Sequence, residues 1–239
     1  MAKAPKKATK KPLRALKPVK RKPAAKKTTK KTAAKDLSVY ILLDRSGSMQ
    51  SLWDEALSSI NTYVHELEGP TKATMAVFDS GGYDVVRDTT AATWKDVTNT
   101  DAHPRGMTPL YDSAGKMLDR MYADNPKSGV FVVMTDGYEN ASSEYTRTTI
   151  LSRIEAAKKD KNWQVIFLGA EFNDVGAVSS SLGVGKGQTV NMTTGNMGAT
   201  MRGLATYTTS YAATATPMSF TDEDRVTAGE IKKNTVTSK

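Results

Sequence analysis

The chain has 239 residues, no cysteine and a formal net charge of +9 at pH 7. Disulfide bonds within the chain are excluded, no window holds the ~18 apolar residues of a membrane-spanning helix, and the basic N-terminus lacks the apolar run of a signal peptide. We therefore expect a protein that is not secreted and is cytoplasmic, nucleoid-associated or part of a virion.

The positive charge is concentrated in residues 1–35, which contain 15 Lys or Arg and no acidic residue, whereas residues 36–239 contain 19 basic and 25 acidic side chains. Like charges repel and few apolar side chains are present, so we predict a disordered basic tail. Its Lys/Ala/Pro composition resembles the tails of linker-histone-like and bacterial histone-like proteins.

A tail of this kind binds nucleic-acid phosphates by releasing condensed counterions. No aromatic residue precedes Tyr40, so we expect no base stacking and no sequence-specific readout, and DNA and RNA remain equal candidates. A solubilising extension is the alternative interpretation. The candidate phosphate-binding residues are Lys6, Lys7, Lys10, Lys11, Lys20, Arg21, Lys22, Lys26, Lys27, Lys30 and Lys31.

Residues 36–213 are predicted to form one α/β domain, because short apolar runs alternate with amphipathic stretches. Such alternation favours a mostly parallel sheet with helices on both faces. The Gly81-Gly82 pair predicts a hairpin and hence one antiparallel edge strand. The expected strands are 37–43, 73–79, 83–88, 128–135, 165–169 and 188–192, and the expected helices are 49–68, 108–121, 144–159, 173–182 and 194–213.

Two segments, one inside the predicted domain and one after it, lack a clear pattern of strands or helices. Residues 89–107 are expected to form a polar connection that Trp94 and Val97 anchor. Residues 214–239 are expected to form a polar C-terminal segment, in which a short helix over 222–232 is left open.

The main chemical signal is a D-x-S-x-S motif, Asp44 to Ser48, directly after the apolar run of residues 39–43. Thr108 lies in GMTPLYD, where we expect it to be the N-cap of a helix whose first residue is Pro109. Asp136 follows a second apolar run. Carboxylate and hydroxyl oxygens at the carboxyl ends of strands are suited to Mg²⁺.

The order Asp44, Ser46, Ser48, Thr108, Asp136 resembles the metal-ion-dependent adhesion site of von Willebrand factor A domains, and GMTPLYD with TDGYENAS is most similar to intracellular bacterial and phage members. The resemblance implies a Rossmann-like, doubly wound, six-stranded sheet. It also implies that these residues bind Mg²⁺, or alternatively Mn²⁺, and that an Asp or Glu of a partner protein completes the metal site.

A purely structural role is the alternative interpretation of the five residues, since Ser, Thr and Asp are also favoured as helix caps and turn formers. The rim of a ligand site has three candidates, Met107, His103 and Glu139. Met107 is expected to make apolar contact with the ligand. His65, on a helix, is expected to be structural.

Three functions remain open. The first is a protein-binding adaptor that uses Mg²⁺ and is tethered to nucleic acid by the tail. The second is a DNA-packaging or virion-associated structural protein in which the tail performs the main task. The third is a metal-dependent phosphoesterase or nuclease, which we disfavour because Mg²⁺ activates water less than Zn²⁺ and no phosphate-binding or nucleophile motif is present. We expect a protein that is not an enzyme.

Overall fold

A computed structural model describes Met1, residues 36–67 and residues 69–232. The chain divides into two units, Met1–Lys31 and Thr32–Lys239, and the second contains all the helices and strands described below. Apart from Met1, the predicted basic tail, including all its candidate phosphate-binding residues, lies outside the described residues.

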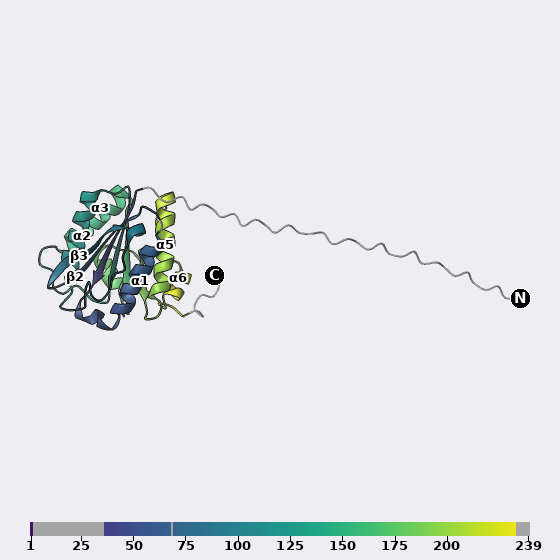
Figure 1. Cartoon of the computed structure of the whole chain (residues 1–239), viewed down its shortest axis with the longest axis horizontal. Coiled ribbons are helices and arrows are strands. Elements are labelled where there is room, and N and C mark those ends of the chain that lie inside the picture. Colours follow the sequence, from purple (N-terminus) through teal and green to yellow (C-terminus); the bar gives the residue numbers. More distant parts are fainter. Residues whose placement is uncertain (2–35, 68, 233–239) are drawn as a thin grey trace. The chain divides into compact units, whose positions relative to one another are not determined.

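Apart from one pair of consecutive strands and one pair of consecutive α-helices, strands and α-helices alternate along the described part of the chain (Figure 1). The strands are β1 (Leu37–Asp44), β2 (Lys72–Asp79), β3 (Gly82–Thr90), β4 (Ser128–Thr135), β5 (Gln164–Ala170) and β6 (Thr189–Met192). The α-helices are α1 (Trp53–Glu66), α2 (Leu110–Asp124), α3 (Arg147–Lys161), α4 (Val175–Ser181), α5 (Met197–Thr214) and α6 (Asp222–Thr227). Short 3-10 helices cover Gly47–Ser51, Ala91–Thr93 and Lys186–Gln188.

The six strands form one sheet in the order β3-β2-β1-β4-β5-β6. All neighbouring strands are parallel except β2 and β3, which pair antiparallel around the turn that ends at Gly82. The predicted fold class, an α/β domain with a mostly parallel six-stranded sheet and one antiparallel edge, is therefore confirmed.

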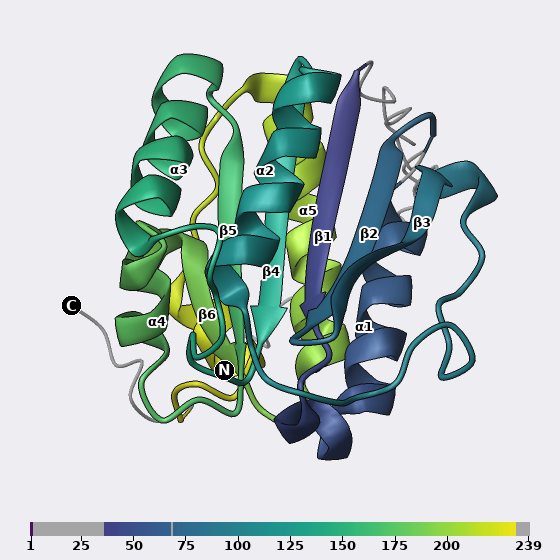
Figure 2. The ribbon, with the colours of Figure 1, turned by 90° about the vertical axis from the view of Figure 1, so that its left-hand side faces the viewer.

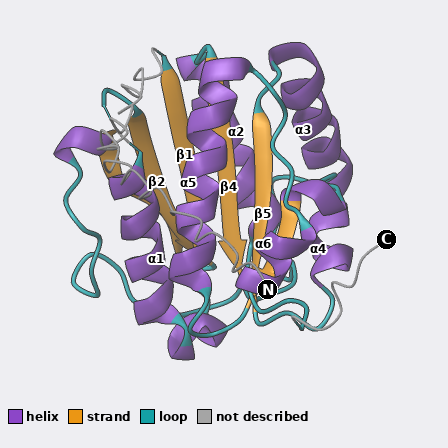
Figure 3. Cartoon of the chain, turned by 90° about the vertical axis from the view of Figure 1, so that its right-hand side faces the viewer, coloured by secondary structure: helices purple, strands orange, loops and turns teal. Residues whose placement is uncertain are grey.

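Helices cover both faces of the sheet, α2, α3 and α4 on one and α1 and α5 on the other (Figures 2 and 3). β1 shows why both layers are needed, since all eight of its residues are buried. Val39, Ile41 and Leu43 belong to the core on the α1 and α5 face. Tyr40 and Leu42 belong to the core on the α2 and α3 face, as the period of two of a strand requires.

The first helical segment begins differently from the prediction. Residues Gly47–Ser51 form a 3-10 turn, and α1 starts only at Trp53. The bonds from Met49 N to Ser46 O (3.1 Å) and from Leu52 N to Met49 O (3.0 Å) tighten this turn. The two serines of the D-x-S-x-S motif are thereby kept at the end of β1.

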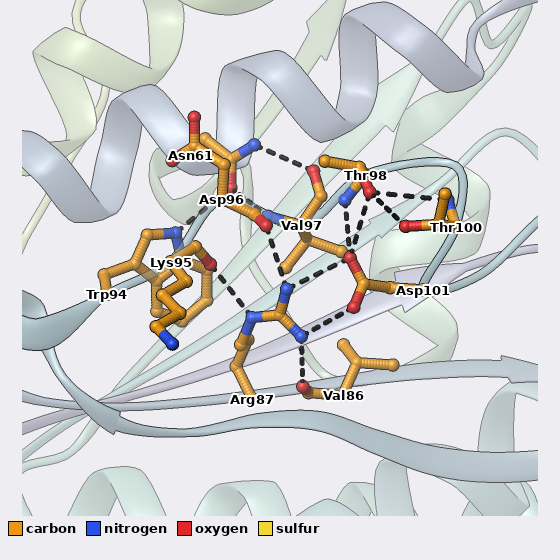
Figure 4. A network of polar contacts seen from close by, with 10 residues as sticks. All are labelled: Asn61, Val86, Arg87, Trp94, Lys95, Asp96, Val97, Thr98, Thr100 and Asp101. Carbon is orange, nitrogen blue, oxygen red and sulfur yellow. Dashed lines mark hydrogen bonds and ion pairs between the residues drawn. The ribbon is translucent and has the colours of Figure 1, made fainter.

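The connection between β3 and α2 is pinned to the domain by one guanidinium group (Figure 4). Arg87 donates to the carbonyls of Lys95 (2.9 Å) and Asp96 (2.9 Å) and to both oxygens of Asp101 (2.8 and 3.0 Å). Trp94 and Val97 are buried, as predicted. The loop that leads to Thr108 is therefore held in place by these contacts.

Residues after α5 also pack on the domain. Met218, Phe220 and Ala228 join the core, and the Tyr207 hydroxyl donates to Asp224 of α6 over 2.6 Å. The helix that the sequence left open forms only over Asp222–Thr227, where Thr221 supplies a capping box. Among the helices of the described residues, none is long and apolar enough to cross a membrane.

Candidate metal centre

The candidate site lies where the strand order reverses. From β1 the chain continues to β2 on one side, and later to β4 on the other, so the carboxyl ends of β1 and β4 border a crevice. The register pairs Leu43 with Met134. Asp44, the last residue of β1, therefore lies beside the end of β4, which Asp136 follows.

Asp44 is the buried floor of the site, with no exposed surface. One carboxylate oxygen accepts a hydrogen bond from the Ser46 amide (2.7 Å) and the other from the Thr135 hydroxyl (2.5 Å). Burial raises the pKa of Asp44 to about 6 against the lowering effect of these hydrogen bonds, and the nearby charge of Asp136 contributes in the same direction as burial. A cation bound beside this buried carboxylate would offset the energetic cost of burying its negative charge.

Two serine hydroxyls connect this floor to the second carboxylate. The hydroxyl oxygens of Ser46 and Ser48 are 3.1 Å apart, and Ser48 donates to Asp136 over 2.7 Å. Burial raises the pKa of Asp136 as well. Ser46 is buried, Ser48 is exposed and Asp136 is half-buried, so the group is open to solvent on one side.

Thr108, just before α2, lies close to the same group. A methyl group placed on Gly137 would lie 3.0 Å from the Thr108 hydroxyl oxygen and 3.5 Å from Asp44 Oδ2. These two oxygens therefore face the same small space, which a glycine leaves free. All five residues predicted for the metal site converge.

The predicted helix-capping role of Thr108 is wrong. The residue flanking α2 is Pro109, and the helix begins at Leu110. Amides of the first turn are satisfied by the segment that follows β4: Tyr111 N donates to Glu139 (2.9 Å), and Asp112 N donates to the Ser142 hydroxyl (3.0 Å). The Thr108 hydroxyl is consequently not used as the cap.

Glu139 organises that same segment. Besides the Tyr111 amide, its carboxylate accepts the amides of Ala141 (2.9 Å) and Ser142 (2.7 Å) and the Ser142 hydroxyl (2.7 Å). Asn140 then bonds both backbone groups of Thr108, at 2.8 and 3.1 Å. Glu139, which the sequence suggested as a rim residue, thus positions the loop that holds Thr108.

The other rim candidates and His65 have simple surroundings. His103 is exposed in the loop before Thr108, and the Met107 side chain is 54% exposed. His65 pairs with Asp96 at 2.6 Å on the surface. Neither histidine belongs to the five-residue group.

Several residues that support the site were missed from the sequence. Thr135 directly precedes Asp136, and its hydroxyl at the end of a buried strand was the available signal. Arg45 is a charge inside the D-x-S-x-S motif, and it is only 5% exposed, because it pairs with Asp79 at 2.6 Å. Nothing local in the sequence indicates that partner.

The donor set fits a hard divalent cation. It offers two carboxylates and three hydroxyl groups and no sulfur or imidazole. Within the described residues no three His, Cys, Asp or Glu side chains cluster in a way that could hold a metal. A site here therefore depends on Ser46, Ser48 and Thr108 as oxygen donors.

A cavity of about 280 Å³ adjoins the site on the side of Asp136. At its wall, the Glu171 carboxylate accepts the amide and hydroxyl of Thr194, both at 2.7 Å. The lining residues are Ser51, Leu52, Asp136, Ala170, Glu171 and Thr194.

Comparison with solved structures identifies the architecture. The vWF domain of the type V pili tip protein Mfa5 from Porphyromonas gingivalis matches with a TM-score of 0.58 and 12% identity over 78% of this chain and 98% of that domain. The fold is von Willebrand factor A-like. A von Willebrand factor type A protein from Catenulispora acidiphila matches with a TM-score of 0.55 and 13% identity.

The von Willebrand factor A-like domain also resembles proximal thread matrix protein 1 from the mussel byssus, with a TM-score of 0.53 and 9% identity. The comparison covers 73% of this chain but 43% of the Catenulispora protein, and 72% of this chain but 46% of the mussel protein, so this chain spans less than half of either. No protein-family model matches the sequence, and no curated protein matches it significantly. At these identities the likeness concerns the fold alone, and the candidate metal centre depends on its own residues.

Proposed function

We propose that the von Willebrand factor A-like domain is a Mg²⁺-dependent protein-binding module that holds an Asp or Glu side chain of a partner protein. The observation that carries the proposal is the convergence of Asp44, Ser46, Ser48, Thr108 and Asp136 at one open edge of the sheet. The five residues would hold the ion, and Mg²⁺ would supply positive charge and a ligand position for the partner's carboxylate.

The protein's own residues explain why a partner carboxylate is favoured. Both oxygens of Asp44 already accept hydrogen bonds, from Ser46 N and from the Thr135 hydroxyl, so its negative charge is shared with these donors. Asp136 likewise accepts the Ser48 hydroxyl. Five protein groups would leave at least one of the six ligand positions of Mg²⁺ open, and a partner's carboxylate can occupy it.

A binding role also agrees with the proteins that share the fold. One structural neighbour is a pilus tip protein and another is a thread matrix protein. We propose binding without catalysis for this chain, because bound Mg²⁺ lowers the pKa of water less than Zn²⁺ does.

The test combines metal binding with partner capture. The wild-type protein and the variants Ser48→Ala and Asp160→Ala, the latter changing an exposed carboxylate on α3, are titrated with Mg²⁺ by calorimetry and thermal unfolding. We expect Mg²⁺ to stabilise the wild type and Asp160→Ala, by roughly 2.7 kcal/mol at a hundredfold excess over Kd, and to stabilise Ser48→Ala much less.

The same proteins are then used to capture partners from nuclease-treated lysate, in Mg²⁺ and in EDTA. Partners that disappear in EDTA and with Ser48→Ala support the proposal. Partners retained equally under all conditions, or stabilisation by Mg²⁺ that Ser48→Ala leaves unchanged, would contradict it.

We further propose that residues 1–35 attach the protein to nucleic acid without sequence preference, in the cytoplasm, at the nucleoid or in a virion. The support is the concentration of 15 basic and no acidic side chains in this segment. Binding of the full chain to duplex DNA and to RNA should weaken as salt is added, and on duplex DNA each phosphate that the tail neutralises should contribute roughly −0.9 to the slope of log K against log salt.

The variant for this second test replaces the KK pairs by Gln, at Lys6, Lys7, Lys10, Lys11, Lys26, Lys27, Lys30 and Lys31. We expect a shallower salt slope, and an unchanged slope in this variant would contradict the nucleic-acid role. Because the Mg²⁺ site is untouched, its metal binding should equal that of the wild type.

A further inference from the structure

Two exposed large apolar side chains lie next to residues of the candidate metal centre. In the described part of the chain, the large hydrophobic residues that are exposed are Met1, Val85, Met107 and Tyr138. Met107 directly precedes Thr108, and Tyr138 is two residues after Asp136. Isolated exposed hydrophobics are ordinary, but two that flank metal-site residues on different loops call for a local explanation.

The two loops lie against each other. Asn140 N donates to the Thr108 carbonyl (3.1 Å), and Thr108 N donates to the Asn140 side chain (2.8 Å). Gly137, the neighbour of Tyr138, lies so near the Thr108 hydroxyl that a Cβ there would be 3.0 Å away. Met107 and Tyr138 therefore flank the site from two sides, Met107 beside Ser80 after β2 and Tyr138 beside Phe172 after β5.

The Met107 backbone is fixed although its side chain is 54% exposed. Its amide donates to the Ser80 hydroxyl, and its carbonyl accepts the Ser80 amide, both at 3.0 Å. The side chain is thus held out from an ordered loop. A flexible thioether in such a place adapts to differently shaped apolar groups.

Tyr138 is fixed from below by an aromatic contact. Its ring meets that of Phe172 edge-on, with centroids 5.5 Å apart and planes at 78°. Phe172 is buried, and its amide donates to Asn191 over 3.0 Å. Tyr138 nevertheless remains 53% exposed, so an ordered ring is presented to solvent at little further entropic cost.

We propose that Met107 and Tyr138 form an apolar rim on two sides of the metal position, against which large apolar side chains next in sequence to the partner's metal-bound Asp or Glu are buried. This inference rests on the proposed function, and it names the partner as a protein segment in which an acidic residue has an aromatic, Leu or Met neighbour. The carboxylate is selected by charge at the metal, while the neighbour is selected by burial against the rim. Aromatic residues and Met are the types enriched in protein interfaces.

The test uses displayed peptide libraries with a fixed central Asp, and a matched library with a fixed central Asn, on the full-length protein in Mg²⁺. We expect the Asp library to be enriched in peptides with a large apolar residue beside the Asp. The best peptide, synthesised, should bind Met107→Ser/Tyr138→Ser at least about tenfold more weakly than the wild type. Val85→Ser removes a similarly exposed side chain from β3, where it pairs with Ala76, and should bind normally.

The outcomes separate this inference from the proposed function. Asp peptides that bind in Mg²⁺ without an apolar neighbour, or that bind the double variant as well as the wild type, would overturn the rim and leave the metal-dependent function standing. Enrichment that is equal with the Asn library, or in EDTA, would overturn both. Mg²⁺-dependent self-association that is abolished in the double variant would overturn the inference in favour of a second copy of this chain.

Discussion

Arg45 and Asp79 form a buried ion pair directly beside the candidate metal centre, with 2.6 Å between the guanidinium Nε and the carboxylate. The same carboxylate accepts Arg105 Nε over 2.8 Å and the Gly81 amide. The Arg105 amide in turn donates to the Arg45 carbonyl over 2.7 Å. Asp79 therefore ties the loop after β1 to the loop that carries Thr108.

Replacing Asp79 tests this connection. Asp79→Ala leaves the Arg45 guanidinium buried with one remaining carboxylate, Asp84, so we expect a loss of about 3 kcal/mol in the free energy of unfolding. Mg²⁺ affinity should also fall, because Thr108 loses its support. Urea unfolding and calorimetry measure the two effects.

Asp84 provides the matched control, since it bonds the same Arg45 side chain but its own is 57% exposed. Asp84→Ala should cost at most about 1 kcal/mol. Equal losses for the two variants would show that the buried pair has no special role.

Asp44→Asn separates the stability of the fold from metal binding. Burial raises the pKa of Asp44 to about 6 in the folded protein, above the ordinary pKa of an aspartate near 4. In the metal-free protein, the ionised carboxylate therefore destabilises the fold at pH values above about 6. As the pH falls from about 6 to about 4, the carboxyl group becomes protonated in the folded state and the free energy of unfolding rises. In EDTA at neutral pH, Asp44→Asn should therefore be at least as stable as the wild type.

In Mg²⁺ the wild type should instead be more stable than Asp44→Asn. The ion requires the carboxylate, so Mg²⁺ should raise the melting temperature of the wild type more at about pH 7.5 than at about pH 5, and that of Asp44→Asn at neither pH. Thermal unfolding with and without EDTA at both pH values tests this. A wild-type shift that is independent of pH would argue against Asp44 as a ligand.

Glu139→Gln should weaken the loop that positions Thr108. The charged carboxylate accepts hydrogen bonds from Tyr111, Ala141 and Ser142, and the amide side chain of Gln offers a single acceptor atom. We expect a loss of about 1–3 kcal/mol in stability and weaker Mg²⁺ binding. Glu144→Gln, which removes an exposed ion pair with Lys116, should cost less than about 1 kcal/mol.

Gly137→Ala should impair the metal site more than the fold. The added methyl group would lie 3.0 Å from the Thr108 hydroxyl oxygen and displace it. Calorimetry should show lower Mg²⁺ affinity with a small change in unfolding free energy. Gly203→Ala on α5, where nothing lies within 4 Å of the new methyl group, should bind Mg²⁺ normally and gain up to about 1 kcal/mol from helix propensity.

Local sequence was sufficient to predict the architecture, and together with the family resemblance it named five polar residues that the structure brings to one edge of the sheet. A strand buried on both faces is a continuous apolar run, as in Ser128–Thr135, whose bounds were predicted correctly. The hairpin depended on two adjacent glycines, and the candidate ligands Asp44 and Asp136 on their places at the ends of apolar runs. All of these signals are contained within a few consecutive residues.

The roles of the supporting residues depended on contacts between distant segments. Thr108 looks like a helix cap because Pro109 follows it, yet the first turn of α2 is capped by Glu139 and Ser142 from beyond β4. Likewise, a charged residue in the site motif, Arg45, is buried only because Asp79 lies at the end of the neighbouring strand. No local pattern encodes such pairings, because they arise when the sheet brings the carboxyl ends of its strands to one edge.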